Sequence, residues 1–163
     1  MSANDLSNLL WRERELLELL VFKLEEEQLL LTAGKSRWLP QATREVEAVL
    51  ARIRLAGFER TVEASAVAIE WGLSEDATLR RLVERAPSDT WRDILQAHLT
   101  ALSSLTAQIA EVRDTNLTYL RAATRATQET LATVGSGPAG YDGRGARSTA
   151  GSGTVGAFFD RRV

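Results

Sequence analysis

The sequence contains no cysteine, one histidine and three prolines among 163 residues. Without cysteine the chain cannot form a disulfide, a zinc finger or a thiol nucleophile, and a single histidine excludes most histidine-based catalysis. The spacings typical of a nucleophile with its base, of a metal cluster or of a phosphate loop are also missing from the sequence. We therefore expect no enzyme activity, no catalytic residue, no metal and no cofactor.

Two features could be mistaken for chemical sites. His98 has no acidic or thiol partner at ligand spacing, so we interpret it as a residue on the flank of a helix. Glu25, Glu26 and Glu27 occupy consecutive helix positions, which point in three directions and cannot enclose one ion. We expect these three glutamates to form a solvated face.

The sequence also lacks a strong charge of one sign and a long apolar run. The formal net charge is -2, and no basic stripe follows a predicted helix face, which argues against nucleic-acid binding. Charged residues such as those at 12–15 interrupt the apolar stretches near the N-terminus, so we expect neither a signal peptide nor a membrane span. With 44% hydrophobic and 26% charged residues, the composition is typical of one modest domain with a buried core.

Apolar residues at helical spacing predict a first long helix over about 5–33. Asn4 is the expected N-cap, and Gly34 is the expected stop because glycine adopts the left-handed conformation at no steric cost. The apolar seam of this helix is formed by Leu6, Leu10, Leu17, Leu20, Leu24 and Leu31.

A second long helix is expected from Pro40, which fits a first helical turn, to Gly72. Its seam contains Ala42, Val46, Val49, Ile53 and Ala56 and continues less regularly to Val67. Gly57 inside this helix either produces a bend or is tolerated at a cost of about 1 kcal/mol relative to alanine. A short connector helix follows, with Ser74 as its expected cap and its end before Pro87.

A third long helix, capped by Ser88 or Asp89, is expected to reach Val134. Its core seam is expected to include Leu102, Leu105, Ile109, Val112, Asn116, Tyr119 and Ala123. At 1.5 Å per residue this helix would be about 70 Å long and the other two about 45 Å each, so about 20 Å of it would stay uncovered in an antiparallel bundle.

A second apolar stripe begins beyond Thr115 on this third helix. It is formed by Leu117, Leu120, Thr124, Thr127, Leu131 and Val134. Threonines lower helix propensity where no neighbour supports the helix, so this stretch either orders on contact with a partner or frays. Asn116, just before the stripe, either fixes the register of the bundle, as buried asparagines do in coiled coils, or contacts the partner directly.

The predicted fold is all-α: an antiparallel bundle of three long helices, with a short connector helix and a disordered glycine-rich C-terminal tail. Such a bundle brings Trp11, Trp71 and Trp91 together at one pole, where we expect them in the core.

Most of the 11 glycines follow the third helix. We therefore assign residues 1–134 to a helical domain and residues 135–163 to a flexible tail. Aromatic residues in a tail without a core are candidate docking points, and Tyr141 and the Phe158-Phe159 pair are such residues.

In this order and spacing, these parts resemble the FlgN family of flagellar export chaperones over nearly the whole chain. The resemblance rests on the glutamate-rich leucine helix at 9–17, the break at Gly34, the long second helix, the helix at 116–131 with Arg125, and the Tyr141-Asp142-Gly143 segment.

The resemblance implies a cytoplasmic chaperone that binds the C-terminal helices of the hook-associated proteins FlgK and FlgL, prevents their premature assembly and delivers them to the type III export gate. Substrate binding is implied near the end of the last helix, at Asn116, Leu117, Leu120, Thr124, Thr127, Leu131 and Val134. Docking on the export-gate protein FlhA is implied at Tyr141, Asp142 and Gly143. The Phe158-Phe159 pair has no role in the family pattern.

The main alternative is a structural coiled-coil homodimer, in which the third helix pairs with its own copy and the tail is a tether. A membrane-surface helix is a weaker alternative, because Thr124 and Thr127 stand where large apolar residues would be needed.

Overall fold

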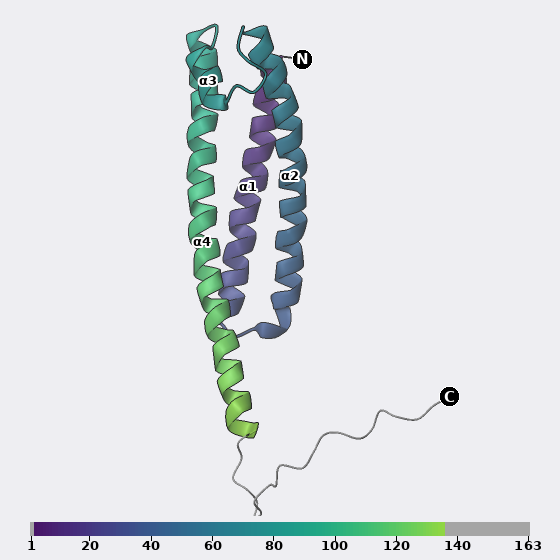
Figure 1. The fold of residues 1–163 in the computed structure, drawn as a ribbon, viewed down its shortest axis with the longest axis vertical. Coiled ribbons are helices and arrows are strands. Elements are labelled where there is room, and N and C mark those ends of the chain that lie inside the picture. Colours follow the sequence, from purple (N-terminus) through teal and green to yellow (C-terminus); the bar gives the residue numbers. More distant parts are fainter. Residues whose placement is uncertain (1, 136–163) are drawn as a thin grey trace, which may run out of the picture. The chain divides into compact units, whose positions relative to one another are not determined.

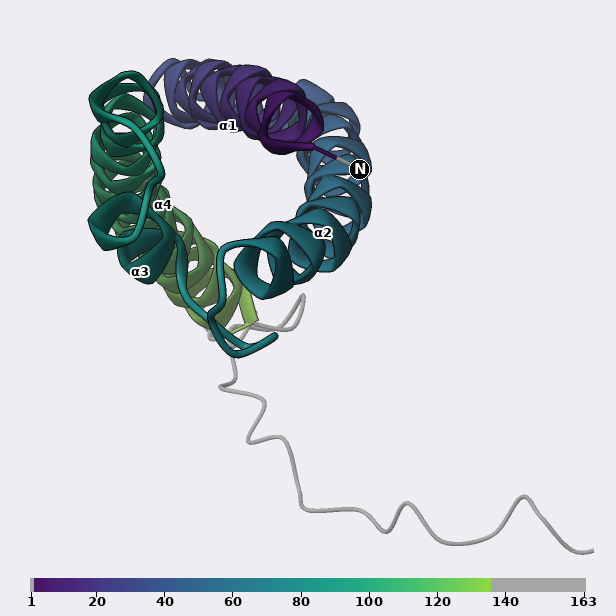
Figure 2. The same cartoon turned by 90° about the horizontal axis from the view of Figure 1, so that it is seen from above.

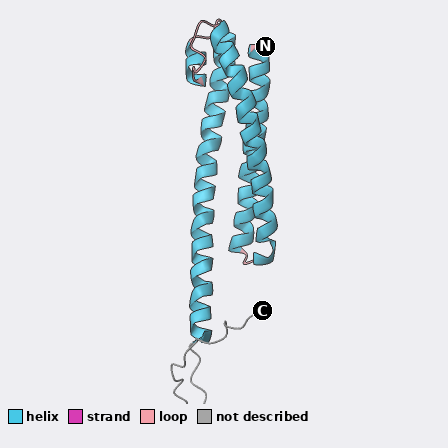
Figure 3. Ribbon diagram, turned by 45° about the vertical axis from the view of Figure 1, so that its right-hand side comes forward, coloured by secondary structure: helices cyan, strands magenta, loops and turns pink. Residues whose placement is uncertain are grey.

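The computed structural model describes residues 2–135, and all regular elements within that range are helical (Figures 1 and 3). They are α1 (Ala3–Thr32), the short 3-10 helix η1 (Ser36–Trp38), α2 (Leu39–Glu70), α3 (Leu79–Glu84) and α4 (Asp89–Gly135). The contacts divide the chain into a first unit that ends at Ala122 and a second unit that begins at Ala123. The predicted all-α class and the long helices are confirmed, whereas the predicted tail from 136 onward lies outside the described residues.

The start of α1 differs from the prediction. Ser2, not Asn4, is the N-cap: its hydroxyl accepts a hydrogen bond from the Asp5 N–H at 3.3 Å, and the Asp5 carboxylate accepts one from the Ser2 N–H at 3.0 Å. This reciprocal arrangement is a capping box, and it satisfies two donors where a single cap satisfies one. At the other end Gly34 has a φ of 65°, which confirms the predicted glycine stop.

The connector helix is shorter than predicted. Thr78 caps it by accepting a hydrogen bond from the Arg81 N–H at 3.4 Å. The predicted cap, Ser74, instead donates its hydroxyl hydrogen to the Asp76 carboxylate in the preceding turn. Ser88 accepts a hydrogen bond from the Trp91 N–H at 3.3 Å at the start of α4, as predicted.

One end of the first unit, seen from above as a ribbon in Figure 2, holds the main apolar core. Its buried residues come from α1, α2, α3 and α4: Leu6, Leu10, Val67, Ala68, Leu82, Val83 and Leu95. The predicted meeting of the start of the first helix, the end of the second and the start of the third is therefore confirmed.

The predicted tryptophan core at this end is wrong for Trp11. Trp71 is half-buried and packs against the core, but Trp11 is 52% exposed. Its ring lies edge-on to the His98 ring at 5.2 Å and beneath the Arg14 guanidinium at 4.1 Å. An amphipathic indole at the rim keeps its N–H in water, which a place in this leucine and valine core would not allow.

α1 and α2 are joined by a second apolar cluster and by three ion pairs. Leu20, Leu24, Val46 and Val49 form the buried part of the cluster. The ion pairs are Arg12–Glu59 at 3.0 Å, Lys23–Glu45 at 2.6 Å and Arg60–Glu13 at 3.1 Å.

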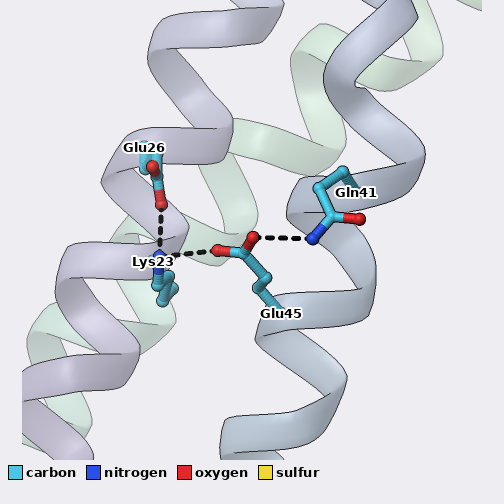
Figure 4. Close-up of polar contacts among 4 residues, drawn as sticks. All are labelled: Lys23, Glu26, Gln41 and Glu45. Carbon is cyan, nitrogen blue, oxygen red and sulfur yellow. Dashed lines mark hydrogen bonds and ion pairs between the residues drawn. The ribbon is translucent and has the colours of Figure 1, made fainter.

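Lys23 bridges two carboxylates on the surface of this helix pair (Figure 4). Its ammonium donates to Glu26 and to Glu45, and Gln41 donates to the other oxygen of Glu45. The hydrogen bonds to Glu26 and Glu45 raise the pKa of Lys23, and the hydrogen bond from Lys23 lowers the pKa of Glu45. The bridge therefore favours the charged forms of Lys23 and Glu45.

Glu13 is a buried carboxylate that faces α2 near Gly57. Burial raises the pKa of Glu13, and the charge of Arg60 opposes that rise. A Cβ at Gly57 would lie 4.0 Å from the Glu13 carboxylate, and α2 runs through Gly57 as one helix. Gly57 is thus tolerated without a break in the helix.

α4 runs parallel to α1 and is fixed to it by two buried polar residues. His98 is 1% exposed and its Nε2 lies 3.1 Å from the Ser7 hydroxyl. Asn116 is 3% exposed and its amide donates to the Leu24 carbonyl at 2.9 Å and to the Glu27 carboxylate at 3.2 Å. The separations of 91 residues for Ser7–His98 and 92 for Leu24–Asn116 show one constant register.

These contacts correct two predictions. His98 is a core residue rather than a helix-flank residue, and burial together with the charge of Arg14 lowers the pKa of His98. Glu27 is buried rather than solvated, because it accepts hydrogen bonds from Asn116 and from the Thr43 hydroxyl of α2 at 3.0 Å. Its carboxylate therefore links α1, α2 and α4.

The buried imidazole predicts a loss of stability in mild acid. Because the pKa of His98 is lowered from 6.5 in the folded chain, the unfolded chain binds a proton first as the pH falls below 6.5. The stabilisation from neutral His98 is complete above that pH and is lost as the pH falls towards the folded pKa, with a slope of at most about 1.4 kcal/mol per pH unit. Urea unfolding across this range should show a shallower pH dependence for His98→Gln than for the wild type. Glu13, whose pKa is raised, acts in the opposite direction in both proteins, so equal slopes would contradict the role of His98.

The Asn116 contacts predict a sizeable cost for their removal. Asn116→Ala leaves a buried Glu27 oxygen without its donor, so the free energy of unfolding should fall by about 1–3 kcal/mol. The matched control is Thr118→Ala, because the exposed Thr118 hydroxyl bonds only the Asp114 carbonyl of its own helix. Chemical denaturation should show a change within about 0.5 kcal/mol for the control, and a comparable change in both variants would show that Asn116 holds nothing in place.

Candidate partner-binding surface

The last part of α4 is exposed on every side. α4 is a single helix of 47 residues, and every residue from 117 to 135 is exposed. Among its apolar residues, Leu131 is 66% and Val134 is 75% exposed.

The predicted stripe falls in both units and is described separately in each. In the first unit, Leu117 and Leu120 are exposed near its end. In the second unit, the described residues form the last turns of α4. There Thr124, Thr127, Leu131 and Val134 follow one another at steps of three and four, which places them on one face of a helix.

Thr127 shows how this face accommodates polar residues. Its hydroxyl donates to the Ala123 carbonyl at 3.0 Å within the same helix. A hydroxyl that is satisfied in this way can be covered by an apolar partner at a lower cost than an unpaired hydroxyl.

Asn116 does not belong to this exposed face, although it was expected among the binding residues. Its side chain is buried in the first unit against Leu24 and Glu27. Of the two interpretations left open by the sequence, the structure favours fixation of the register.

The predicted core seam of α4 ends earlier than expected. Tyr119 and Ala123 were placed in the seam, but both are exposed. The last buried residue of α1 is Glu27, which Asn116 already contacts. Asn116 is therefore the last buried residue of the α4 seam.

Charge and polarity around the exposed face are mixed. The charged residues of the stretch 117–135 are Arg121, Arg125 and Glu129, all exposed. The charge of this stretch is thus two positive and one negative, which suits a partner helix with an acidic flank.

The described residues offer no obvious alternative site for chemistry. Between residues 2 and 135, no cluster of three or more histidine or acidic side chains could hold a metal ion. Within the same range, no helix combines the length and apolarity needed to cross a membrane. A pocket of about 360 Å³ lies at the turn between α1 and α2, but its two rim carboxylates, Glu26 and Glu45, are both bound by Lys23.

Two sets of residues lie outside the predicted α4 face. Tyr141, Asp142 and Gly143, expected to dock on the export gate, lie outside the described residues. α2 also has an exposed apolar face that was not predicted from the sequence, formed by Leu55, Phe58, Val62 and Ile69. Its spacing of three, four and seven residues is a coiled-coil signal that would have identified it.

Comparison with known proteins identifies the family. The family model described as FlgN protein matches residues 1–149, a range that contains all the helices described above. No curated protein and no solved structure matches the chain. The chain belongs to the FlgN family, a family of flagellar export chaperones.

Proposed function

We propose that this protein is a flagellar type III export chaperone that binds the C-terminal helices of hook-filament junction proteins through the exposed face of α4. The face consists of Leu117, Leu120, Thr124, Thr127, Leu131 and Val134. The observation that carries the proposal is that this apolar series is exposed on a continuous helix of a FlgN-family chain.

The physical basis is the burial of apolar surface between two amphipathic helices. Each square ångström of apolar surface removed from water contributes about 25 cal/mol, and a helix laid along the α4 face would cover leucine, valine and threonine methyl groups. Covering the end of a junction subunit in this way prevents its premature assembly, because the same subunit surface is no longer available to a second subunit.

The proposed partners rest on the resemblance to the family pattern. The junction subunits are the hook-associated proteins FlgK and FlgL, which the chaperone would hold in the cytoplasm and deliver to the export gate. Docking on the gate protein FlhA is assigned to Tyr141, Asp142 and Gly143 through the resemblance of this segment to the family pattern.

A charge introduced into the exposed face should abolish partner binding without unfolding the bundle. Leu131→Asp replaces a contact worth about 1.5–3 kcal/mol with a charge, so the affinity for a C-terminal helical peptide of a junction subunit should fall at least about tenfold in calorimetry. The control is Ala122→Asp, because Ala122 is exposed and, at about 100° per residue, lies on the opposite side of the helix.

Thermal unfolding should leave the midpoint of both variants close to that of the wild type. On mixing with the peptide, helicity should rise for the wild type and the control but not for Leu131→Asp. A peptide affinity that is unchanged in Leu131→Asp would refute the α4 face as the binding surface and leave a structural homodimer as the better function.

The gate assignment is tested separately from subunit binding. Tyr141→Ala should leave the affinity for the junction-subunit peptide unchanged, because the residue follows the binding face in sequence. Export should fall, and the measurement is the amount of junction subunits secreted by cells that carry the variant. Normal secretion together with normal motility would show that Tyr141 has no part in docking.

A further inference from the structure

α2 has a second apolar face that the bundle does not use. Leu55, Phe58, Val62 and Ile69 are between 46% and 68% exposed. These four residues are called the outer seam of α2. The exposed Ala51 precedes them at the same spacing, so the apolar strip from residue 51 to residue 69 is about 28 Å long at 1.5 Å per residue.

The outer seam is separate from the core of the bundle. α2 buries another side, formed by Ala42, Val46, Val49, Ala56 and Val67, against α1 and the end of the first unit. Both sets repeat at steps of three and four, but they are more than a quarter turn apart around the helix. The strip is interrupted at Ser65, which is half-buried and donates a hydrogen bond to the Glu75 carbonyl. Exposed apolar strips of this length mark interaction surfaces.

The spacing assigns the seam to heptad positions. Leu55, Val62 and Ile69 occupy successive a positions, and Phe58 occupies a d position between them. Apolar residues repeated in this way on both helices pack as knobs into holes and supercoil. The seam is therefore built to pack against another helix rather than against a small molecule.

The charged residues that flank the seam indicate which helix could pair with it. The flanking g positions hold Glu47 and Arg54, and the flanking e positions hold Arg52 and Glu59. In a parallel coiled coil, a g residue of one helix faces the e residue five positions later in the other helix.

If the second helix is α2 of another copy, both of these cross-helix pairs are attractive. Glu47 faces Arg52 of the second copy, and Arg54 faces Glu59 of the second copy. Two-fold symmetry repeats each pair, which gives four opposite-charge pairs and no like-charge pair. In an antiparallel arrangement e faces e and g faces g, so neither pair forms.

We propose that the outer seam of α2 pairs with the same seam of a second copy of this chain as a parallel, in-register two-stranded coiled coil. The dimer leaves both bundle cores intact, because none of the seam residues contributes to them. The seam has fewer than three heptads of large apolar residues, so the dimer is reversible and depends on protein concentration. It shares no residue with the α4 face, which makes self-association separable from partner binding.

The first test is sedimentation of the full chain over a concentration series. The wild type should show a monomer–dimer equilibrium, and Phe58→Glu should be monomeric at the concentrations at which the wild type is dimeric. Circular dichroism should show the same helicity and thermal midpoint for both, because Phe58 is exposed. The control Ala107→Glu, at an exposed position of α4, should dimerise like the wild type.

The second test uses charge reversals to determine whether the partner is a second copy of α2 and whether the two helices are parallel. Arg54→Glu sets two carboxylates against each other at the pair with Glu59 of the second copy, and Glu59→Arg sets two guanidinium groups against each other there. Each variant should therefore dimerise at least tenfold more weakly than the wild type. A mixture of the two variants restores opposite charges at both copies of this pair and should recover the wild-type association. Glu59 also pairs with the exposed Arg12 at 3.0 Å, so the helicity of Glu59→Arg is checked against the wild type, while Arg54→Glu leaves that pair intact.

Three outcomes would overturn the proposal. One is a wild type that stays monomeric throughout the concentration series, and another is a dimer that survives Phe58→Glu. The third is a mixture of Arg54→Glu and Glu59→Arg that associates no better than either variant by itself. If Phe58→Glu instead weakens binding of the junction-subunit peptide while sedimentation is unchanged, the outer seam docks a partner helix and self-pairing is refuted. None of these results depends on the α4 face, so the function proposed above can stand when this proposal fails.

Discussion

The hydrogen bonds of Asn116 to the Leu24 carbonyl and to the Glu27 carboxylate fix where the buried part of α4 ends. A buried amide or carboxylate without a partner costs more free energy than one additional apolar contact returns, so a shift of α4 along α1 would be unfavourable even where leucines could repack. The His98–Ser7 contact fixes the other end of the same interface in the same register. Because the register is fixed, the first exposed residue after the seam is fixed as well, and it is Leu117.

Polar residues in the seam therefore determine more than local stability. An all-leucine seam on α1 and α4 would permit several registers that differ by a heptad, and each register would leave a different length of α4 exposed. With His98 and Asn116 in place, only one register satisfies both side chains. The chain thus specifies where its exposed face begins through two buried hydrogen-bonded residues of α4, His98 and Asn116. They lie 18 positions apart, and their partners on α1, Ser7 and Leu24, lie 17 positions apart.

Much of the fold could be predicted from the sequence because its signals are local. Glycine stops, the proline in the first turn of α2 and the leucine periodicity of α1 depend only on neighbouring residues, and they placed each long helix to within a few residues. The buried glutamates could not be predicted in the same way. Glu13 and Glu27 are covered because Arg60, Thr43 and Asn116 reach them from other helices, and no pattern within α1 shows that such partners exist. The position of Trp11 at the rim has the same origin, since it depends on His98 and Arg14.

The two apolar faces were not equally predictable. The exposed stripe of α4 was expected from the element lengths alone, because a helix of about 70 Å is longer than helices of about 45 Å, and its role in partner binding stays a prediction. The α2 face was not predicted because α2 carries two apolar stripes. The stripe that contains Ala42, Val46 and Val49 is the more regular of the two, and it alone was expected to be the apolar side of the helix.

The compositions of the two faces differ in a way that suits different lifetimes of contact. Two of the six positions of the α4 face are threonine. A leucine at either position would contribute about 1.5–3 kcal/mol when a partner buries it, and a threonine contributes less. If the α4 face binds a subunit that is released at the gate, as proposed above, a face diluted with threonine is appropriate, because it still excludes water while its total burial free energy stays low. The outer seam of α2 has leucine, phenylalanine, valine and isoleucine in the equivalent positions, and a contact between two copies need not be broken at each round of delivery. Under the two proposals, the difference in apolar content matches what each contact has to do after it forms.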